Sequence, residues 1–517
     1  MDVKHFFSAG IRDLYGSPER VFRMAVVIGT ALSVLSLIFT FDIYRDAAGV
    51  YAYFARELGA GNFPGGWVGG IPMLQVALAG AFSFAGVEAF RAHIFLSCLC
   101  YVLTLFPLRG FLRQFLTPLQ AAWGCVLFVT APKLIRFSVA GLIDAGRYFF
   151  MISALYLLFR LKERLSWRDL VLFGLALAGL ALSRCEELFF SLLLLAVLPV
   201  ISLSRQTLPS PEAWKKRLTA LLVAGLVFLA GVTPFCAMNL FRYGAFVTDT
   251  RIGEALGMVS PRPVFRHPAD AAAPSAGETI AVCAGDTLRG GYEPYMAAAL
   301  LGAVLVIRRR RWDRRHTLLA AIFALHTVVY FKFSYAYRYS IYLVPMLMPL
   351  TVAGICGLLE LYRRCPLREE VRRWSDGALF LAAAVVLASQ VANGMAGVIS
   401  RKDRGKRALA AYIRQWGERN VPGRRLRLVC TELRETTYWS GAQSVFNYET
   451  GERDLRSFRD FDLLVIPESR LPELGDRSGL SELPLPDALS RPDGKERYCL
   501  FRTKPELSEK ERDRVLP

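Results

Sequence analysis

An acidic side chain lies just after the first long apolar segment of the chain. Asp46 follows segment 24–41 and precedes an amphipathic helical pattern at 51–58. A carboxylate held at a membrane surface can take a proton from an acceptor that approaches along the bilayer. The alternative is that Asp46 only ends the apolar segment and caps the next helix.

The composition predicts an all-α membrane protein. Of the 517 residues, 54% are hydrophobic, and the mean hydropathy is +0.33. A transmembrane helix needs about 20 apolar residues. Hydropathy and charge predict about 11 such helices, at 24–41, 88–107, 115–132, 142–160, 169–184, 187–203, 218–238, 294–307, 317–333, 341–361 and 377–399. We expect segment 71–86, which contains Pro72, to be a re-entrant or interfacial helix.

Positive charges predict the sidedness. Alternate loops carry the basic clusters, at 4–23, 109–113, 160–168, 205–217, 308–315 and 363–373. The positive-inside rule makes that side, with the N-terminus, cytoplasmic. The formal net charge of +19 then comes largely from the basic loops on the cytoplasmic side. No nucleic-acid-binding module accompanies it, and the compact Arg-rich loops favour a bacterial inner membrane.

The remaining loops and the C-terminal region fall on the opposite side. We expect residues 1–400 to form a transmembrane domain and residues 401–517 a small extracytoplasmic α/β domain. The second has a helix pattern at 406–419 and strand patterns at 425–430 and 461–467. Its Cys430 and Cys499 could pair in an oxidising compartment. The long loop 239–292 has the length of a lid or binding loop.

Charged residues also lie at the outer ends of other apolar segments, where burial of charge is costly. Asp144 is one, although Arg147 at i+3 could neutralise it locally. Arg184, Glu186 and Glu187 form a tight turn between two segments. They are either solvated there or placed at the depth of a lipid phosphate.

A third outer segment adds basic candidates. Arg338, with Tyr337 beside it, either snorkels within an aromatic belt or binds phosphate through its planar guanidinium. Lys133 and Arg136 are weaker candidates of the same kind. These cations and the acids come from distant parts of the sequence, yet the predicted topology collects them on one face of the membrane.

This collection suits transfer from a lipid phosphate. A carboxylate can deprotonate the acceptor, and cations can stabilise the charge that grows on the departing phosphate. A sugar on a polyprenyl phosphate is the natural donor, because nucleotide sugars are generally not available outside the cytoplasm. No P-loop, dinucleotide fingerprint or nucleophile elbow occurs, so an ATP-driven machine is not expected.

Four motifs resemble the GT-C glycosyltransferases of family 39 and the aminoarabinose-transferase type, which include protein O-mannosyltransferases. They are YRDAAGVYAYFARELGAGN with Pro72-Met73, APKLIRFSVAGLIDAGRYFF, GLALAGLALSRCEELFF and YAYRYSIYLVPMLMPL. They occur in the family's order over residues 20–360, and each is individually loose. The resemblance implies a GT-C fold and an inverting transfer from a polyprenyl-phosphate sugar to a lipid, glycan or protein acceptor.

The resemblance also implies residue roles. Asp46 would be the general base or would orient the acceptor, Asp144 would support it, and Arg184 and Arg338 would bind the donor phosphate. Many family members have Asp-Glu at the first acid, whereas Ala47 follows Asp46 here, and whether Glu57 compensates is an open question. The resemblance leaves a divalent metal as an open question, and no cofactor is assigned.

Two other functions remain open at this point. A transporter or flippase of lipid-linked glycans would use the same outer charges without chemistry. It would also carry polar residues deep in several membrane segments, and few occur. A membrane scaffold that presents the C-terminal domain to a partner would not need Asp46, Asp144 or Arg338 individually.

Overall fold

The computed structural model describes most of the chain. The described residues are 16–40, 47–202, 211–255, 257, 258, 285, 288–333, 337–366, 368–399, 404–430, 434–444, 461–474, 480–492 and 497–503. Statements below refer to these residues.

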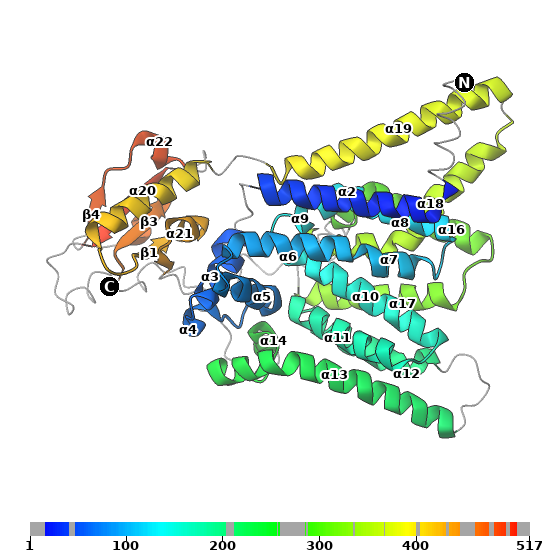
Figure 1. The fold of residues 1–517 in the computed structure, drawn as a ribbon, viewed down its shortest axis with the longest axis horizontal. Helices are drawn as coiled ribbons and strands as arrows, with labels where there is room; N and C mark the ends of the chain where they lie inside the picture. The colour runs from blue at the N-terminus through cyan, green and yellow to red at the C-terminus, as the bar shows by residue number, and fades with distance from the viewer. Residues whose placement is uncertain are drawn as a thin grey trace.

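A bundle of helices makes up most of the molecule (Figure 1). They are α2 (Pro18–Phe39), α6 (Ala89–Leu103), α7 (Leu105–Leu112), α8 (Pro118–Thr130), α9 (Pro132–Ser138), α10 (Asp144–Glu163), α11 (Trp167–Ser183), α12 (Glu187–Ser202), α13 (Pro211–Tyr243), α16 (Glu293–Arg308), α17 (Arg314–Phe333), α18 (Leu343–Arg364) and α19 (Glu369–Ala396). Every predicted transmembrane segment falls on one of these helices or on a consecutive pair.

Five of the described helices are long and apolar enough to cross a membrane, and a sixth span results if the bent pair α8 and α9 is counted as one. They are Pro18–Phe39, Ala89–Leu112, Trp214–Tyr243, Ser340–Arg364 and Trp374–Ala396. The chain is therefore a helical membrane protein. The larger number of crossings and their sidedness stay predictions.

Short helices gather at one end of the bundle (Figure 1). They are the π-helix η1 (Ala47–Ala52), α3 (Tyr53–Gly59), α4 (Phe63–Gly66) and α5 (Met73–Phe84), with α14 (Thr250–Ala255) nearby. Helix α5 covers the segment expected to be re-entrant or interfacial; it is apolar but has only 12 residues, and it packs against α3 and α6. Its length agrees with a segment that does not span, while its position relative to the bilayer stays a prediction.

The end with the short helices is tied to the segment that follows α13. Trp67 Nε1 donates to Asn239 Oδ1 at 2.9 Å, and Thr250 N donates to the carbonyl of Gly69 at 2.8 Å. The long loop predicted to begin at Asn239 therefore starts with the last residues of α13. The chain from there through α14 is held against the short helices. Most of the rest of that loop, residues 259–284, lies outside the described residues.

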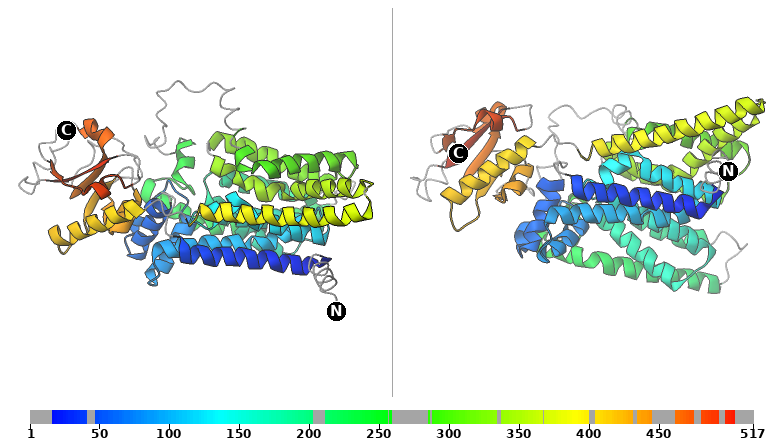
Figure 2. Two further views of the ribbon diagram at one scale, coloured as in Figure 1. Left: turned by 90° about the horizontal axis from the view of Figure 1, so that it is seen from above. Right: turned by 45° about the horizontal axis from the view of Figure 1, so that its top comes forward.

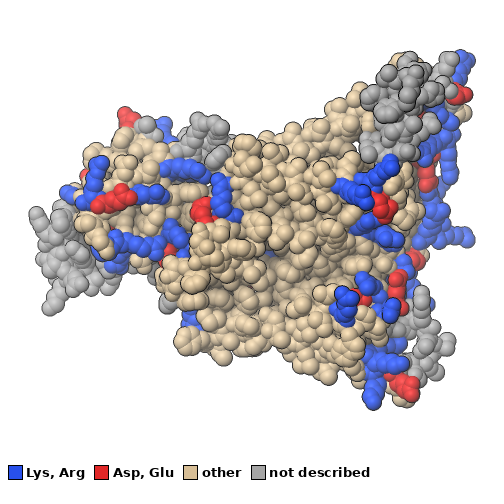
Figure 3. All heavy atoms as spheres, viewed as in Figure 1, with Lys and Arg blue, Asp and Glu red and all other residues tan. Residues whose placement is uncertain are grey.

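Basic side chains gather at the opposite end of the bundle, and a second set lies on the C-terminal unit (Figure 3). Between them, the visible surface of the bundle is mostly uncharged. The basic end carries ion pairs between neighbouring helices, including Arg315 to Glu163 at 2.9 Å and Arg309 to Glu360 at 2.7 Å. This distribution agrees with the basic side that the sequence predicts.

The helices α16 and α18 approach each other closely through glycine. A Cβ atom added to Gly302 would lie 1.9 Å from the carbonyl oxygen of Leu350, and one added to Gly354 would lie 1.9 Å from that of Ala298. Small residues allow such backbone contact between helices in membranes. The sequence therefore needs glycine at these two positions for packing.

We expect Gly302→Ala to destabilise the protein by about 1–3 kcal/mol, the usual range for overpacking. Gly377→Ala is the matched control, because Gly377 lies within α19 and nothing lies within 4 Å of its added Cβ. That control should be neutral or stabilising by up to about 1 kcal/mol through helix propensity. Thermal unfolding in detergent compares the two, and equal midpoints would contradict the packing account.

The C-terminal unit, residues 404–503 as described, is a mixed sheet with helices at one end of the molecule (Figure 2). Its elements are α20 (Arg404–Asn420), β1 (Arg427–Cys430), α21 (Arg434–Ser440), β2 (Gln443–Ser444), β3 (Leu463–Pro467), η5 (Glu468–Leu474), β4 (Leu480–Leu483), α22 (Asp487–Ser490) and β5 (Tyr498–Thr503). The strand order is β2-β1-β3-β5-β4, with β1 parallel to β2 and β3, and β5 antiparallel to β3 and β4. The predicted helix and both predicted strands are confirmed.

The expectation that Cys430 and Cys499 could pair is wrong. Cys430 lies opposite Val465 of β3, and Cys499 lies opposite Ile466, the next residue of the same strand. Successive strand residues point to opposite faces. The two cysteines accordingly belong to the separate apolar clusters on the two faces of the sheet.

Candidate active site

Buried charged side chains meet where α10 begins, α11 ends and α12 begins. Asp144 and Arg147 lie in the first turn of α10, Arg184 follows the last residue of α11, and Glu186 and Glu187 lead into α12. Each of these residues is at most 5% exposed. Ionised groups at such depth are stable only when they are paired and hydrogen-bonded. With His326, these residues form what we call the charge cluster.

Local sequence explains why charges can stand at this point. Gly141 has a φ of 74°, a conformation that glycine adopts without strain, and this allows the chain to turn between α9 and α10. Asp144 then begins α10, where a negative charge is favourable. The extended backbone of Arg184, with φ −161° and ψ 151°, ends α11 and reverses the chain toward α12.

Arg184 joins two of the carboxylates. Its Nε donates to Glu186 Oε1 at 2.5 Å, and its Nη1 lies 3.9 Å from Asp144 Oδ1. The structure therefore brings together Asp144 and Arg184, which are 40 positions apart in the sequence. Their predicted roles in catalysis and phosphate binding stay predictions.

Arg147 and Glu187 form the second half of the cluster. The Nε of Arg147 donates to Glu187 Oε1 at 2.5 Å, and both side chains are fully buried. His326 Nε2 lies 3.2 Å from the same carboxylate, and the guanidinium of Arg147 stacks over the ring of Tyr342. The alternative in which this turn carries solvated charges is therefore wrong.

Glu186 lies in the turn between two bundle helices. Burial raises its pKa, but Arg184 and Arg147 outweigh burial and hold it below the usual value of 4.5. The carboxylate is therefore ionised at neutral pH. A donor phosphate that binds Arg184 must share this guanidinium with Glu186.

Other predicted residues lie elsewhere. Lys133 and Arg136 are on α9, where Lys133 Nζ is 3.5 Å from Glu293 Oε2 of α16, and Arg136 packs beside Gly397 at the end of α19. Glu57 is bound by Arg425 of the C-terminal unit. This ion pair occupies the Glu57 carboxylate, and the question whether Glu57 also compensates for the missing second acid stays with the sequence prediction.

Three predicted residues cannot be placed. Asp46 lies outside the described residues, and so do the side chains of Tyr337 and Arg338. The backbone of the last two belongs to the short helix η3 (Tyr337–Tyr342), directly before α18. Their assignments stay predictions from sequence.

Sequence reasoning missed two members of this neighbourhood. His326 lies in the apolar helix α17 and is 1% exposed; an ionisable residue within a predicted membrane helix was the available signal. Arg251 of α14 binds Asp249 through two hydrogen bonds, of 3.0 and 2.6 Å, and its charge interacts with Glu186. Nothing in local spacing connects Arg251 to the turn at Arg184.

The described residues contain no group of three or more His, Cys, Asp or Glu side chains that could hold a metal ion. The carboxylates of the charge cluster are instead matched by guanidinium groups. What the described cluster offers chemically is a set of fixed charges in a water-poor site. Such charges stabilise an anion that develops during a reaction.

Comparison with known protein families gives a match over part of the chain. Residues 70–235 match the family described as dolichyl-phosphate-mannose-protein mannosyltransferase. This region covers α5 to α13 and includes every acid and arginine of the charge cluster. Over this part of its length the chain is similar to that mannosyltransferase family. A search of curated proteins finds no match.

Solved structures share the fold. ArnT from Cupriavidus metallidurans bound to undecaprenyl phosphate is 15% identical, with a TM-score of 0.61 over 94% of this chain and 98% of that chain. The apo state of the same protein gives a TM-score of 0.59 at 16% identity over 92% of this chain and 97% of that chain. The Archaeoglobus fulgidus oligosaccharyltransferase in the apo form gives 0.53 at 15% identity, over 88% of this chain and 70% of that chain. At these identities the likeness shows the fold alone.

Proposed function

We propose that the chain is a membrane glycosyltransferase that moves a sugar from a polyprenyl phosphate to an acceptor at the extracytoplasmic face of a bacterial inner membrane. The observation that carries the proposal is the charge cluster inside the family-matched region. It holds Arg184 beside Asp144, where α11 ends and α10 begins, and these helix ends lie toward the C-terminal unit (Figure 1). The full-length likeness to a protein solved with undecaprenyl phosphate supports the class of donor.

In the proposed reaction Asp46 takes the proton of the acceptor hydroxyl or amine. The acceptor atom attacks the anomeric carbon of the sugar, and the bond from that carbon to the phosphate oxygen breaks. A single displacement of this kind inverts the anomeric centre. Arg184 and Arg338 stabilise the phosphate that leaves with the polyprenyl chain, and Asp144 orients Arg184 and supports the base.

The proposed organisation has two domains. Residues 1–400 hold the site within the membrane, with the N-terminus cytoplasmic, and residues 401–517 form the extracytoplasmic domain. The two apolar clusters of the C-terminal unit, one on each face of its sheet, support a separate folding unit. The acceptor, whether lipid, glycan or protein, approaches from that side.

A panel assay tests the class of donor. The purified protein in nanodiscs is given polyprenyl-phosphate sugars or nucleotide sugars, and release of polyprenyl phosphate or nucleotide is measured. We expect turnover of at least one lipid donor and none of the nucleotide sugars. Turnover of nucleotide sugars alone, or tight binding of every lipid donor without turnover, would overturn the proposal.

A further inference from the structure

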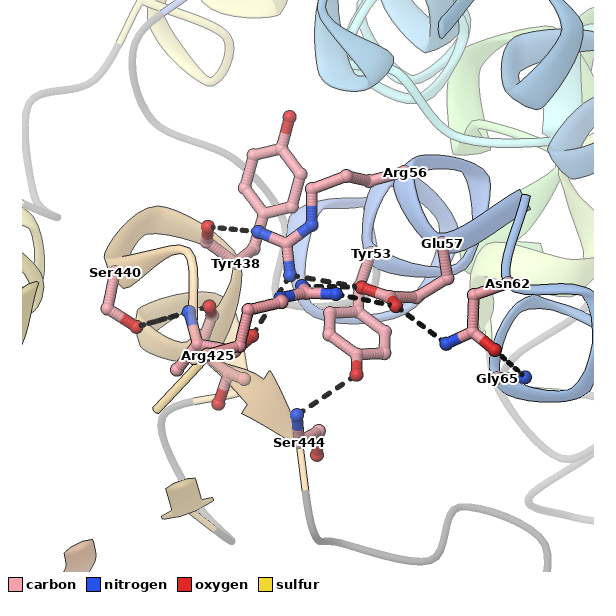
Figure 4. Close-up of polar contacts among 11 residues, drawn as sticks. Tyr53, Arg56, Glu57, Asn62, Gly65, Arg425, Tyr438, Ser440 and Ser444 are labelled. Carbon is pink, nitrogen blue, oxygen red and sulfur yellow. Dashed lines mark hydrogen bonds and ion pairs between the residues drawn. The ribbon is translucent and has the colours of Figure 1, made fainter. Parts of the chain in front are cut away.

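We propose that the C-terminal unit positions the first outer segment for catalysis, with Arg425 as its principal positioning residue and Tyr438 as a second contact. This inference rests on the proposed function, because its target is the segment that begins after Asp46. The observation behind it is a set of hydrogen bonds between residues more than 340 positions apart, and Figure 4 shows those made by Tyr53, Arg56 and Glu57. We call this set the clamp: Tyr53, Arg56, Glu57, Glu88, Arg425, Tyr438 and Ser444.

Glu57 is the centre of the clamp. It lies on α3 and its side chain is fully buried. Arg425 donates two hydrogen bonds to it, from Nη1 to Oε2 at 2.9 Å and from Nη2 to Oε1 at 2.7 Å, and Asn62 donates a third at 3.0 Å. Burial raises the pKa of Glu57, but these donors outweigh it and hold the pKa below 4.5, so the pair is ionic at neutral pH. A two-pronged contact of this kind fixes orientation as well as distance.

Arg56 provides the second contact. Its two terminal nitrogens donate to the carbonyls of Tyr438 and Ala442 at 2.9 and 3.0 Å. Its guanidinium also lies between the rings of Tyr53 and Tyr438, at 5.2 and 5.3 Å from their centres. Consecutive residues of α3 thus hold two different parts of the C-terminal unit, as Figure 4 shows.

Tyr438 extends the clamp to a bundle helix. Its hydroxyl donates to Glu88 Oε1 at 2.7 Å and accepts from the backbone N–H of Phe90 at 3.1 Å. The second of these hydrogen bonds satisfies the backbone N–H of Phe90 in the first turn of α6. Glu88, the residue that precedes this helix, does not cap it with its own side chain. The Tyr438 side chain also belongs to the apolar core of the bundle rather than to that of the C-terminal unit.

The clamp acts on the chain immediately after Asp46. Helix η1 begins at Ala47 and continues directly into α3, and α21 packs against η1. Consecutive Cα atoms are about 3.8 Å apart, so fixing Ala47 limits where Asp46 can lie. Arg425 and Tyr438 therefore act on the predicted base through the segment that begins at Ala47.

Arg425 can be replaced without opening either apolar cluster of the C-terminal unit. Neither apolar cluster of the C-terminal unit includes Arg425, which is 41% exposed. Its neighbour Arg424 pairs with Asp462 inside the C-terminal unit, at 2.5 Å. Two adjacent arginines thus provide a matched pair. Arg425 binds Glu57 of α3, and Arg424 binds Asp462 of the C-terminal unit itself.

The test compares Arg425→Gln and Arg425→Lys with Arg424→Gln in the full-length protein. Two quantities are measured: kcat and donor KM for the lipid donor, and hydrogen exchange of the peptide 47–58. We expect Arg425→Gln to lower kcat by about 10²-fold, the cost of a misplaced reacting group, with little change in donor KM and with faster exchange. Arg425→Lys should restore part of kcat, because it keeps the charge but not the fork, and Arg424→Gln should behave as wild type.

Several outcomes would overturn the proposal. An unchanged kcat in Arg425→Gln would do so, and so would an equal loss in Arg424→Gln or unchanged exchange of residues 47–58. If Arg425→Gln does not accumulate as folded protein, the near-isosteric Glu57→Gln takes its place in the same comparison. If the wild type turns over no lipid donor, the proposed function fails, while the exchange comparison still decides whether Arg425 holds this segment.

Discussion

Asp46→Asn should abolish sugar transfer while leaving binding of the lipid donor intact. The substitution keeps the size of the side chain and removes its ability to take a proton. General base catalysis typically contributes about 10²–10⁴-fold to a rate, so we expect a loss of that order in kcat. Transfer from a radiolabelled polyprenyl-phosphate sugar measures the first property, and retention of the same label on the protein measures the second.

The matched control for this prediction is Asp376→Asn. Asp376 lies in the first half of α19, is exposed, and accepts a hydrogen bond from the Tyr362 hydroxyl at 2.9 Å, which asparagine can also accept. The same chemical change should therefore leave transfer unaltered at that position. An Asp46→Asn protein with wild-type kcat would show that Asp46 is not the base and would favour the transporter or scaffold.

Glu187→Ala should strongly destabilise the fold. It removes the carboxylate that binds both Arg147 and His326 in a site where Arg147 and Glu187 are fully buried. Breaking a buried ion pair from one side typically costs about 3–5 kcal/mol, because the other charge stays buried. Thermal unfolding in detergent should show the loss as a lower midpoint and a smaller yield of folded protein.

Two comparisons separate the buried pair from a general effect of lost charge. Arg147→Met combined with Glu187→Leu should recover most of the stability, since apolar replacement of a whole buried pair is often neutral. Glu360→Ala breaks the partly exposed pair with Arg309 and should cost about 1 kcal/mol or less. A double variant that is less stable than either single variant would contradict this account of the pair.

Much of the fold follows from the sequence because periodicity and hydropathy are local signals. Each apolar segment predicted to span falls on a helix, and α20, β1 and β3 lie where the C-terminal patterns place them. The convergence of Asp144 and Arg184 was also predictable, because sidedness alone puts both on one face. In the predicted topology the chain returns to the same membrane face after every second crossing, so residues far apart in the sequence can share that face.

The partners of these charges were not predictable by the same reasoning. Arg147 looked like a local partner of Asp144 because the two are three positions apart, yet the structure pairs it with Glu187 across two helices. Glu57 had no visible partner in the sequence, because Arg425 lies 368 positions away. Composition does not reveal strand register, so the sequence allowed Cys430 and Cys499 to pair. The register places them opposite successive residues of β3 and therefore on opposite faces of the sheet.

Single-turnover transfer with a doubly labelled donor tests the central claim most directly. The donor is a polyprenyl-phosphate sugar with ¹⁴C in the sugar and ³²P in the phosphate, and the wild-type protein in nanodiscs is quenched at early times. We predict that the ¹⁴C leaves the lipid for an acceptor or water while the ³²P stays on the polyprenyl phosphate. Labels that remain together on the lipid would contradict a transferase, and labels that move together would show transfer of a phosphosugar instead of a sugar.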